Sequence, residues 1–175
     1  MLYIVDVDFA QAGLQAEWDA WYMQHIEVLL AVPGVRTAQR FKCLTRFPSP
    51  YLTIYSVDSA QVFESKGYRE RGGRGSTGKW QPLMTNWLRN LFDGLTTAPA
   101  VPEEARLLVT ESQPHEIADC GCEFSWLGNA GLDRTVPWRG IAVVSVANAG
   151  RITEKARGQV RAYRPLTPQM LTSQP

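Results

Sequence analysis

The chain has 175 residues, of which 45% are apolar and 20% are charged, a balance typical of a globular protein with a sizeable core. Its formal net charge of +1 gives no electrostatic basis for binding nucleic acid or an anionic membrane surface, so we expect neither partner. No apolar run approaches the roughly 20 residues of a membrane-spanning helix, the start lacks the basic segment of a signal peptide, and the three cysteines give no disulfide framework, so we expect a cytoplasmic protein.

The first half alternates between strand-like and helical patterns. Residues 2–9 alternate in polarity and are rich in β-formers, which predicts a strand. Residues 13–32 repeat apolar positions three and four apart, which predicts a long amphipathic helix, and Pro33 and Gly34 end it. Further strands are expected at 36–44, 51–57 and 87–95, and a second helix, capped by Asp58, at 58–72. The order strand, helix, strand, strand, helix, strand is the ferredoxin-like βαββαβ motif.

The second half is expected to be mainly strands. Residues 96–105, "TTAPAVPEEA", have the composition of a linker between residues 1–95 and 106–175. Strand patterns follow at 105–112, 122–131, 138–148 and 159–167. The segments "PHEIADCG" and "AGRITEKARG" are too short for more than a turn or two of helix. We therefore interpret the second half as a degenerate ferredoxin-like copy that has lost its helices.

Residues 72–80, "GGRGSTGKW", come close to a phosphate-binding loop. Such a loop requires a strand before it and a helix that starts at its lysine. Here a helical pattern precedes the glycines, Pro82 follows shortly after Lys79, and Trp80 replaces the magnesium-binding Ser or Thr. This context argues against nucleotide binding and leaves two alternatives, a plain connection before the fourth strand or a mobile lid over a pocket.

The segment "EWDAWYMQHIEVLLAVPGVRTAQRF", followed by "YLTIYSV", resembles the dimeric α/β-barrel superfamily. It is most similar to the EthD-like branch, in which a helix with Trp-Tyr-x-x-His leads into Pro-Gly-Val and an Arg-bearing strand. The resemblance covers about residues 1–95. It implies an α+β fold in which a ferredoxin-like half and a degenerate second half form a barrel with helices outside. It also implies a homodimer and a pocket for a small-molecule substrate, while the family's varied activities, haem enzymes among them, leave the reaction open.

His25 is the main catalytic candidate, because a histidine suits proton transfer near neutral pH. Neighbouring aromatic residues on the helix would lower its pKa, and the alternative is a structural role between helix and sheet. Arg40 is either a pocket cation or an edge residue, with Asp6 as its expected partner. On the third strand we expect Thr53, Tyr55 and Val57 to face the barrel interior and Leu52 and Ile54 to face the helices. The predicted substrate-binding residues are Tyr3, Asp6, Trp18, Trp21, Tyr22, Trp80 and Trp87.

A second cluster, "HEIADCGC", contains His115, Asp119, Cys120 and Cys122. Its Cys-x-Cys spacing departs from the Cys-x-x-Cys pairs of zinc sites, so we expect no metal there. A haem would need a proximal ligand such as His25 or His115, but nothing favours one, and we expect no cofactor.

These features predict a small cofactor-independent enzyme that acts on an aromatic or polyketide-like metabolite by proton transfer, in a lyase, isomerase or cyclase step. In this hypothesis His25 is the base, Arg40 holds an anionic group or enolate, and Tyr55 donates a hydrogen bond. The alternative is a non-catalytic binding or assembly protein that uses the same barrel.

Overall fold

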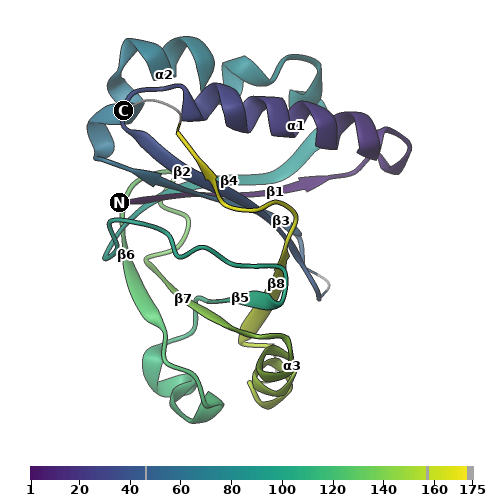
Figure 1. Cartoon of the computed structure of the whole chain (residues 1–175), viewed down its shortest axis with the longest axis vertical. Coiled ribbons are helices and arrows are strands. Elements are labelled where there is room, and N and C mark those ends of the chain that lie inside the picture. The colour runs from purple at the N-terminus through teal and green to yellow at the C-terminus, as the bar shows by residue number, and fades with distance from the viewer. Residues whose placement is uncertain (46, 157, 173–175) are drawn as a thin grey trace.

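The computed structural model describes residues 1–45, 47–156 and 158–172, and the sheet in it closes into an antiparallel barrel (Figure 1). Its strands are β1 (Leu2–Phe9), β2 (Val35–Cys43), β3 (Tyr51–Val57), β4 (Met84–Asp93), β5 (Ala105–Thr110), β6 (Ser125–Leu132), β7 (Trp138–Ser145), β8 (Val160–Pro165) and β9 (Met170–Leu171). Their order is β3-β1-β4-β6-β7-β5-β8-β2, and β2 pairs back with β3 to complete the barrel. The short β9 adds to β2.

Within each half the strands follow the same order, second-third-first-fourth: β2-β3-β1-β4 and then β6-β7-β5-β8. The ladders β4–β6 and β2–β8 join the two halves. The barrel therefore closes within one chain, and no partner is needed to cover its edges. The description of each half as ferredoxin-like stays a prediction, as does the homodimer.

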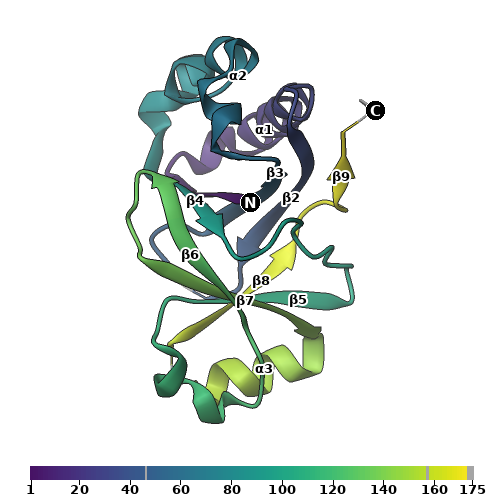
Figure 2. The same cartoon turned by 90° about the vertical axis from the view of Figure 1, so that its left-hand side faces the viewer.

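Three helices of the described residues cover the outside of the barrel: α1 (Gln15–Leu30), α2 (Lys66–Arg71) and α3 (Val146–Lys155). Helices α1 and α2 lie over the first-half strands, and α3 lies at the opposite end of the molecule (Figures 1 and 2). None of the described helices combines the length and the apolar character that crossing a membrane requires.

The barrel interior is filled by aliphatic and aromatic side chains from all eight barrel strands. Its first-half members are Leu2 and Ile4 of β1, Phe41 and Cys43 of β2, Leu52 and Ile54 of β3, and Phe92 of β4. The prediction for β3 is therefore wrong: Leu52 and Ile54 face the interior, whereas Thr53, Tyr55 and Val57 face the helices. Alternation along a strand separates two sets of residues, but both sets are apolar in β3, so the pattern does not say which one faces inward.

A chain of ion pairs lies in this interior. Arg139 Nη1 is 2.9 Å from Asp6 Oδ2, and Arg139 Nη2 is 2.7 Å from Glu111 Oε1, which also pairs with Arg161 at 2.7 Å. Asp6 and Arg139 have side chains only 2% exposed. The predicted Asp6–Arg40 pair is thus wrong. Asp6 points into the barrel, whereas Arg40 points out of it, because Arg40 is next along the strand to the interior Phe41.

Two helix predictions also need correction. Helix α3 shows that the second half has lost only the first of its two helices: Ser145 caps α3 by accepting from the Asn148 N–H, and Ala149 and Ile152 pack on the sheet. The predicted helix at 58–72 is broken into a 3₁₀ turn, η2 (Ala60–Glu64), and α2, whose cap is Ser65. Asp58 is not a cap and instead pairs with Arg36.

The buried ion chain yields a stability prediction. Arg139→Met leaves the Asp6 carboxylate buried without its partner, and we expect it to lower the free energy of unfolding by roughly 3–5 kcal/mol. Adding Asp6→Leu should recover much of this loss. Arg36→Met, which breaks an exposed pair, is the control and should shift the urea midpoint very little. Equal effects of Arg139→Met and Arg36→Met would contradict the buried arrangement.

Candidate functional site

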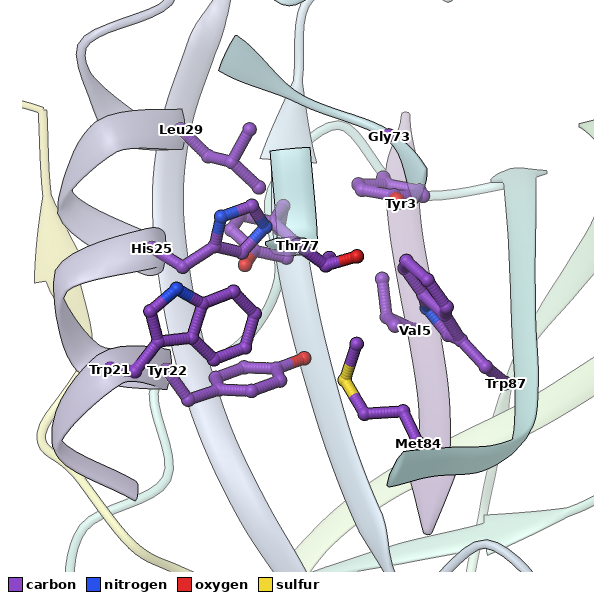
Figure 3. Close-up of a pocket in the computed structure, with 11 residues that line it drawn as sticks. Tyr3, Val5, Trp21, Tyr22, His25, Leu29, Gly73, Thr77, Met84 and Trp87 are labelled. Carbon is purple, nitrogen blue, oxygen red and sulfur yellow. The ribbon is translucent and has the colours of Figure 1, made fainter. Parts of the chain in front are cut away.

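An aromatic pocket lies between α1 and the outer face of the first-half sheet (Figure 3). Trp21, Tyr22, His25 and Leu29 project into it from α1, as the helical spacing of three and four dictates. The opposite wall comes from β1, β3, β4 and the 3₁₀ segment η3 (Arg74–Leu83) with the glycine before it. That wall consists of Tyr3, Val5, Tyr55, Gly73, Thr77, Met84 and Trp87. The pocket is therefore outside the barrel, not in its interior.

The pocket is nearly closed. The space in which the centre of a water molecule can move is about 20 Å³, enough for roughly one water. An aromatic ligand of ordinary size requires the walls to move apart. On one side of the wall, Gly73 and Thr77 belong to a segment whose 3₁₀ conformation is interrupted at Gly78.

His25 is half-buried in this pocket and stacks on Trp21, with ring centroids 5.1 Å apart and an interplanar angle of 17°. Burial among these rings lowers the pKa of His25 from 6.5 to about 4. The imidazole is therefore neutral at physiological pH and offers one nitrogen as a hydrogen-bond acceptor and the other as a donor. A lowered pKa of His25 is the effect that we predicted from the aromatic residues around it in the sequence.

Three tyrosines give the pocket its other polar groups. Tyr3 stacks on Tyr55 with ring centroids 5.4 Å apart, and its hydroxyl lies 3.4 Å from that of Tyr68. The Tyr22 hydroxyl accepts a hydrogen bond from Thr53 Oγ1 at 3.1 Å. Burial raises the pKa of Tyr22 and raises those of Tyr3 and Tyr55 well above the usual range. All three phenols consequently stay protonated, and the lining carries no full charge.

Arg40 is buried behind this pocket and is not part of its lining. Its guanidinium lies 4.4 Å from the ring centroid of Tyr22, 4.7 Å from that of Trp18 and 5.1 Å from that of Tyr51. Nη2 is 2.6 Å from Asp19 Oδ1 on α1. The ion pair and the cation–π contacts fasten α1 to β2.

In residues 72–78, Gly72 and Gly73 are at positions where another residue would clash or be strained. A Cβ on Gly72 would lie 2.5 Å from the Tyr68 ring, and Gly73 has a φ of +72°, which other residues rarely adopt. The segment follows α2 and precedes β4, so the strand–loop–helix context of a phosphate loop is missing, as predicted. Because Gly73 and Thr77 line the pocket, the segment covers the site; whether it opens as a lid stays a prediction.

The structure brings six of the ten predicted site residues into the pocket lining: Tyr3, Trp21, Tyr22, His25, Tyr55 and Trp87. Trp18 and Trp80 are buried next to the pocket, where Trp18 stacks on Phe9 and Trp80 meets Phe9 edge-on. Asp6 lies on the other side of the sheet, in the barrel interior. Sequence reasoning did not assign five lining residues to the site: Val5, Leu29, Gly73, Thr77 and Met84. A signal existed for three of them, since Leu29 is about one helical turn from His25, and Gly73 and Thr77 lie in the glycine segment that the sequence offered as a possible lid.

The residues present do not fit a metal or a haem. Among the described residues, no group of three or more His, Cys, Asp or Glu side chains could hold a metal ion. His115 is exposed, and Cys120 and Cys122 donate to backbone carbonyls of their own loop. His25 lies flat against Trp21 in a space about one water wide, so a porphyrin cannot reach it in this arrangement.

Comparisons with known proteins agree with the fold. No family model matches the chain, and no curated protein matches it in sequence. A chlorite dismutase-like protein of known structure is similar over 95% of this chain and 94% of its own, with a TM-score of 0.56 and 12% identity. The similarity extends over the whole α+β architecture of a closed antiparallel barrel with helices outside. A monooxygenase-like protein from Lactobacillus acidophilus aligns over 97% of both chains at 9% identity, with a TM-score of 0.46.

The lowered pKa of His25 makes stability depend on pH. Unfolded His25 takes up a proton below pH 6.5, whereas the folded form does so only near pH 4, so stability falls as the pH drops through this window. The loss attributable to His25 is roughly 3 kcal/mol. His25→Gln should remove this part of the pH dependence, and His115→Gln should keep it. Histidine NMR titration checks the cause: a His25 midpoint near 6.5 would refute the burial argument.

Proposed function

We propose that the protein is a small cofactor-independent enzyme that acts on an aromatic or polyketide-like metabolite by proton transfer, in a lyase, isomerase or cyclase step. The observation that carries this proposal is the neutral His25 in a pocket that also contains protonated phenols and no charged side chain among the lining residues that the structure describes. Such a lining stacks on a planar ring and offers hydrogen-bond donors to its oxygen atoms.

In this proposal His25 accepts a proton from the substrate. A pKa of about 4 makes the imidazole a weaker base than free histidine but leaves nearly all of it unprotonated at pH 7. Tyr55, with its raised pKa, donates a hydrogen bond to the substrate oxygen on which negative charge develops. Apolar walls such as Val5, Leu29 and Met84 exclude water from both groups.

Arg40 acts on this site through the aromatic layer and not by direct contact. Its positive charge opposes the rise that burial causes in the pKa of both Tyr22 and Tyr55. A charge that favours ionised tyrosines in this place equally favours an enolate bound beside them. In this proposal Arg40 stabilises negative charge in the pocket from a distance and does not bind an anionic group of the substrate directly.

One observation favours the alternative, a non-catalytic binding or assembly protein. The pocket has a free volume of only about 20 Å³, and the barrel interior is filled. Mass spectrometry of ligands retained by gently purified protein separates the two readings. A retained metabolite that the protein converts on incubation supports the enzyme, and a retained metabolite that stays unchanged supports the binding protein.

We also propose that the two halves are ferredoxin-like copies of each other and that the chain belongs to the EthD-like branch. Two ferredoxin-like copies account for the shared strand order of the halves, and membership of the EthD-like branch accounts for the helix with Trp21, Tyr22 and His25. A homodimer would use surfaces other than open sheet edges, because the barrel already closes within the chain.

Substitution of His25 and Tyr55 tests the catalytic roles. On the substrate identified by mass spectrometry, His25→Gln should reduce kcat by roughly 10²- to 10⁴-fold while folding and ligand binding persist. Tyr55→Phe removes one hydrogen bond to developing charge and should cost roughly 10- to 100-fold. The acid limb of the pH profile of kcat/KM should lie near pH 4, not 6.5. Normal turnover by His25→Gln would dispose of His25 as the base.

The small pocket predicts that the covering segment moves. Because residues 72–83 form one wall of a nearly closed space, an aromatic ligand must displace them and then be held beneath them. Hydrogen exchange in residues 72–78 should be fast in the free protein and slower when 2-naphthol saturates the site. The strands β5 and β7 are the internal reference. Unchanged exchange at 72–78 with ligand bound would show a fixed connection and no lid.

A further inference from the structure

The edge of the aromatic pocket contains a cation that the sequence analysis did not single out. Arg89 lies on β4 two residues after Trp87, so both side chains leave the same face of the strand. Its guanidinium carbon is 6.0 Å from the ring centroid of Trp87, which lines the pocket. Arg89 is thus placed beside a pocket whose own lining has no full charge.

Glycine at position 73 leaves open the space between Arg89 and the pocket. Arg89 Nη1 lies 3.9 Å from the position that a Cβ atom on Gly73 would occupy. Any other side chain at this point of the wall would project toward the guanidinium. Gly73 itself lines the pocket, so a group that reaches this part of the wall also approaches Nη1.

The charge of Arg89 reaches the tyrosine layer of the pocket. Burial and the neighbouring Tyr68 and Tyr55 raise the pKa of Tyr3, while the charge of Arg89 acts in the opposite direction. Negative charge in this part of the pocket is therefore stabilised by Arg89. Arg40, the cation expected from the sequence, is shielded from the same space by the ring of Tyr22.

The donors of Arg89 are only partly used by the protein. Nη2 donates to Asp133 Oδ1 at 3.0 Å, and the Arg89 backbone N–H donates to Asp133 Oδ2. Nε is buried and has no hydrogen-bond partner among the described residues. Asp133, which follows β6 in the second half, binds the guanidinium through Nη2, whereas Nη1 is the atom that lies toward Gly73.

We infer that Arg89 is a specificity-determining residue that selects ligands in which an aromatic ring carries a carboxylate or another acidic group. The ring occupies the space between Trp21 and Trp87, and the acidic group lies beside Gly73 and accepts from Nη1. This assignment rests on the proposed function in one respect, that an aromatic ligand occupies the pocket. It adds the ligand's charge and the position of that charge.

The test compares 2-naphthoate with 2-naphthamide, which has the same ring and nearly the same shape but no charge. Binding is followed through the imidazole NMR signals of His25, with His115 as the distant reference and His25→Gln and His115→Gln for assignment. The wild type should bind the carboxylate at least about 10-fold more tightly than the amide, since hydrogen bonds to charged groups are the stronger ones. Arg89→Gln should abolish this preference and leave the amide affinity nearly unchanged.

Two further variants make the result specific. Arg36→Gln breaks a comparable Arg–Asp pair that is not part of the pocket lining and should keep the preference. Asp133→Asn keeps Arg89 but removes its counter-charge, and it should strengthen 2-naphthoate binding several-fold. It also tests the inference if Arg89→Gln proves unstable.

The possible outcomes distinguish the inference from the function on which it rests. If both compounds shift the His25 signals with equal affinity in the wild type, or if Arg89→Gln keeps the preference, the role of Arg89 is overturned and the aromatic site stands. If neither compound shifts the His25 signals, the aromatic site is overturned and the role of Arg89 with it.

Discussion

The structure depends on the two ladders, β4–β6 and β2–β8, that close the barrel within one chain. Closure pairs the edge strands of each half with each other and forces one face of every strand into a common interior. That interior takes the aliphatic face of β1 and β3 and Phe92 of β4, together with the ion chain that begins at Asp6. The aromatic face of β1 and β3 is left outside, where α1, α2 and the segment that contains η3 cover it.

The candidate site is a consequence of this division. Covering an aromatic sheet face with an aromatic helix face gives large rings that do not interdigitate completely, and the remaining space is the pocket. Burial in this layer keeps His25 unprotonated and the tyrosines protonated, so the site combines apolar walls with uncharged donors and acceptors. The full charges of Arg40 and Arg89 lie one layer behind or at the edge, where the protein itself pairs them with Asp19 and Asp133.

The two halves share a strand order but contribute different elements to the candidate site. The first half contributes the long α1, the aromatic face and the covering segment η3. The second half has the short turns η4 (Pro114–Glu116) and η5 (Ala118–Cys120) between its first two strands, where the first half has α1. It still reaches the site, because Asp133 orients Arg89 from across the β4–β6 ladder.

The sequence by itself determined the eight barrel strands to within a few residues, the long helix that ends before Pro33 and Gly34, and the aromatic cluster around His25, because periodicity and turn residues act over a few positions. It also excluded a phosphate loop, since the flanking segments were enough to reject it. Which face of β3 meets α1 was decided only by the tertiary structure, because apolar residues occur on both of its faces and alternation does not say which one is inside. The same holds for the partner of Asp6, since Arg139 is 133 positions away and only barrel closure brings the two together. Gly73 and Arg89 likewise meet through the packing of η3 against β4, a contact that no local pattern in the chain encodes.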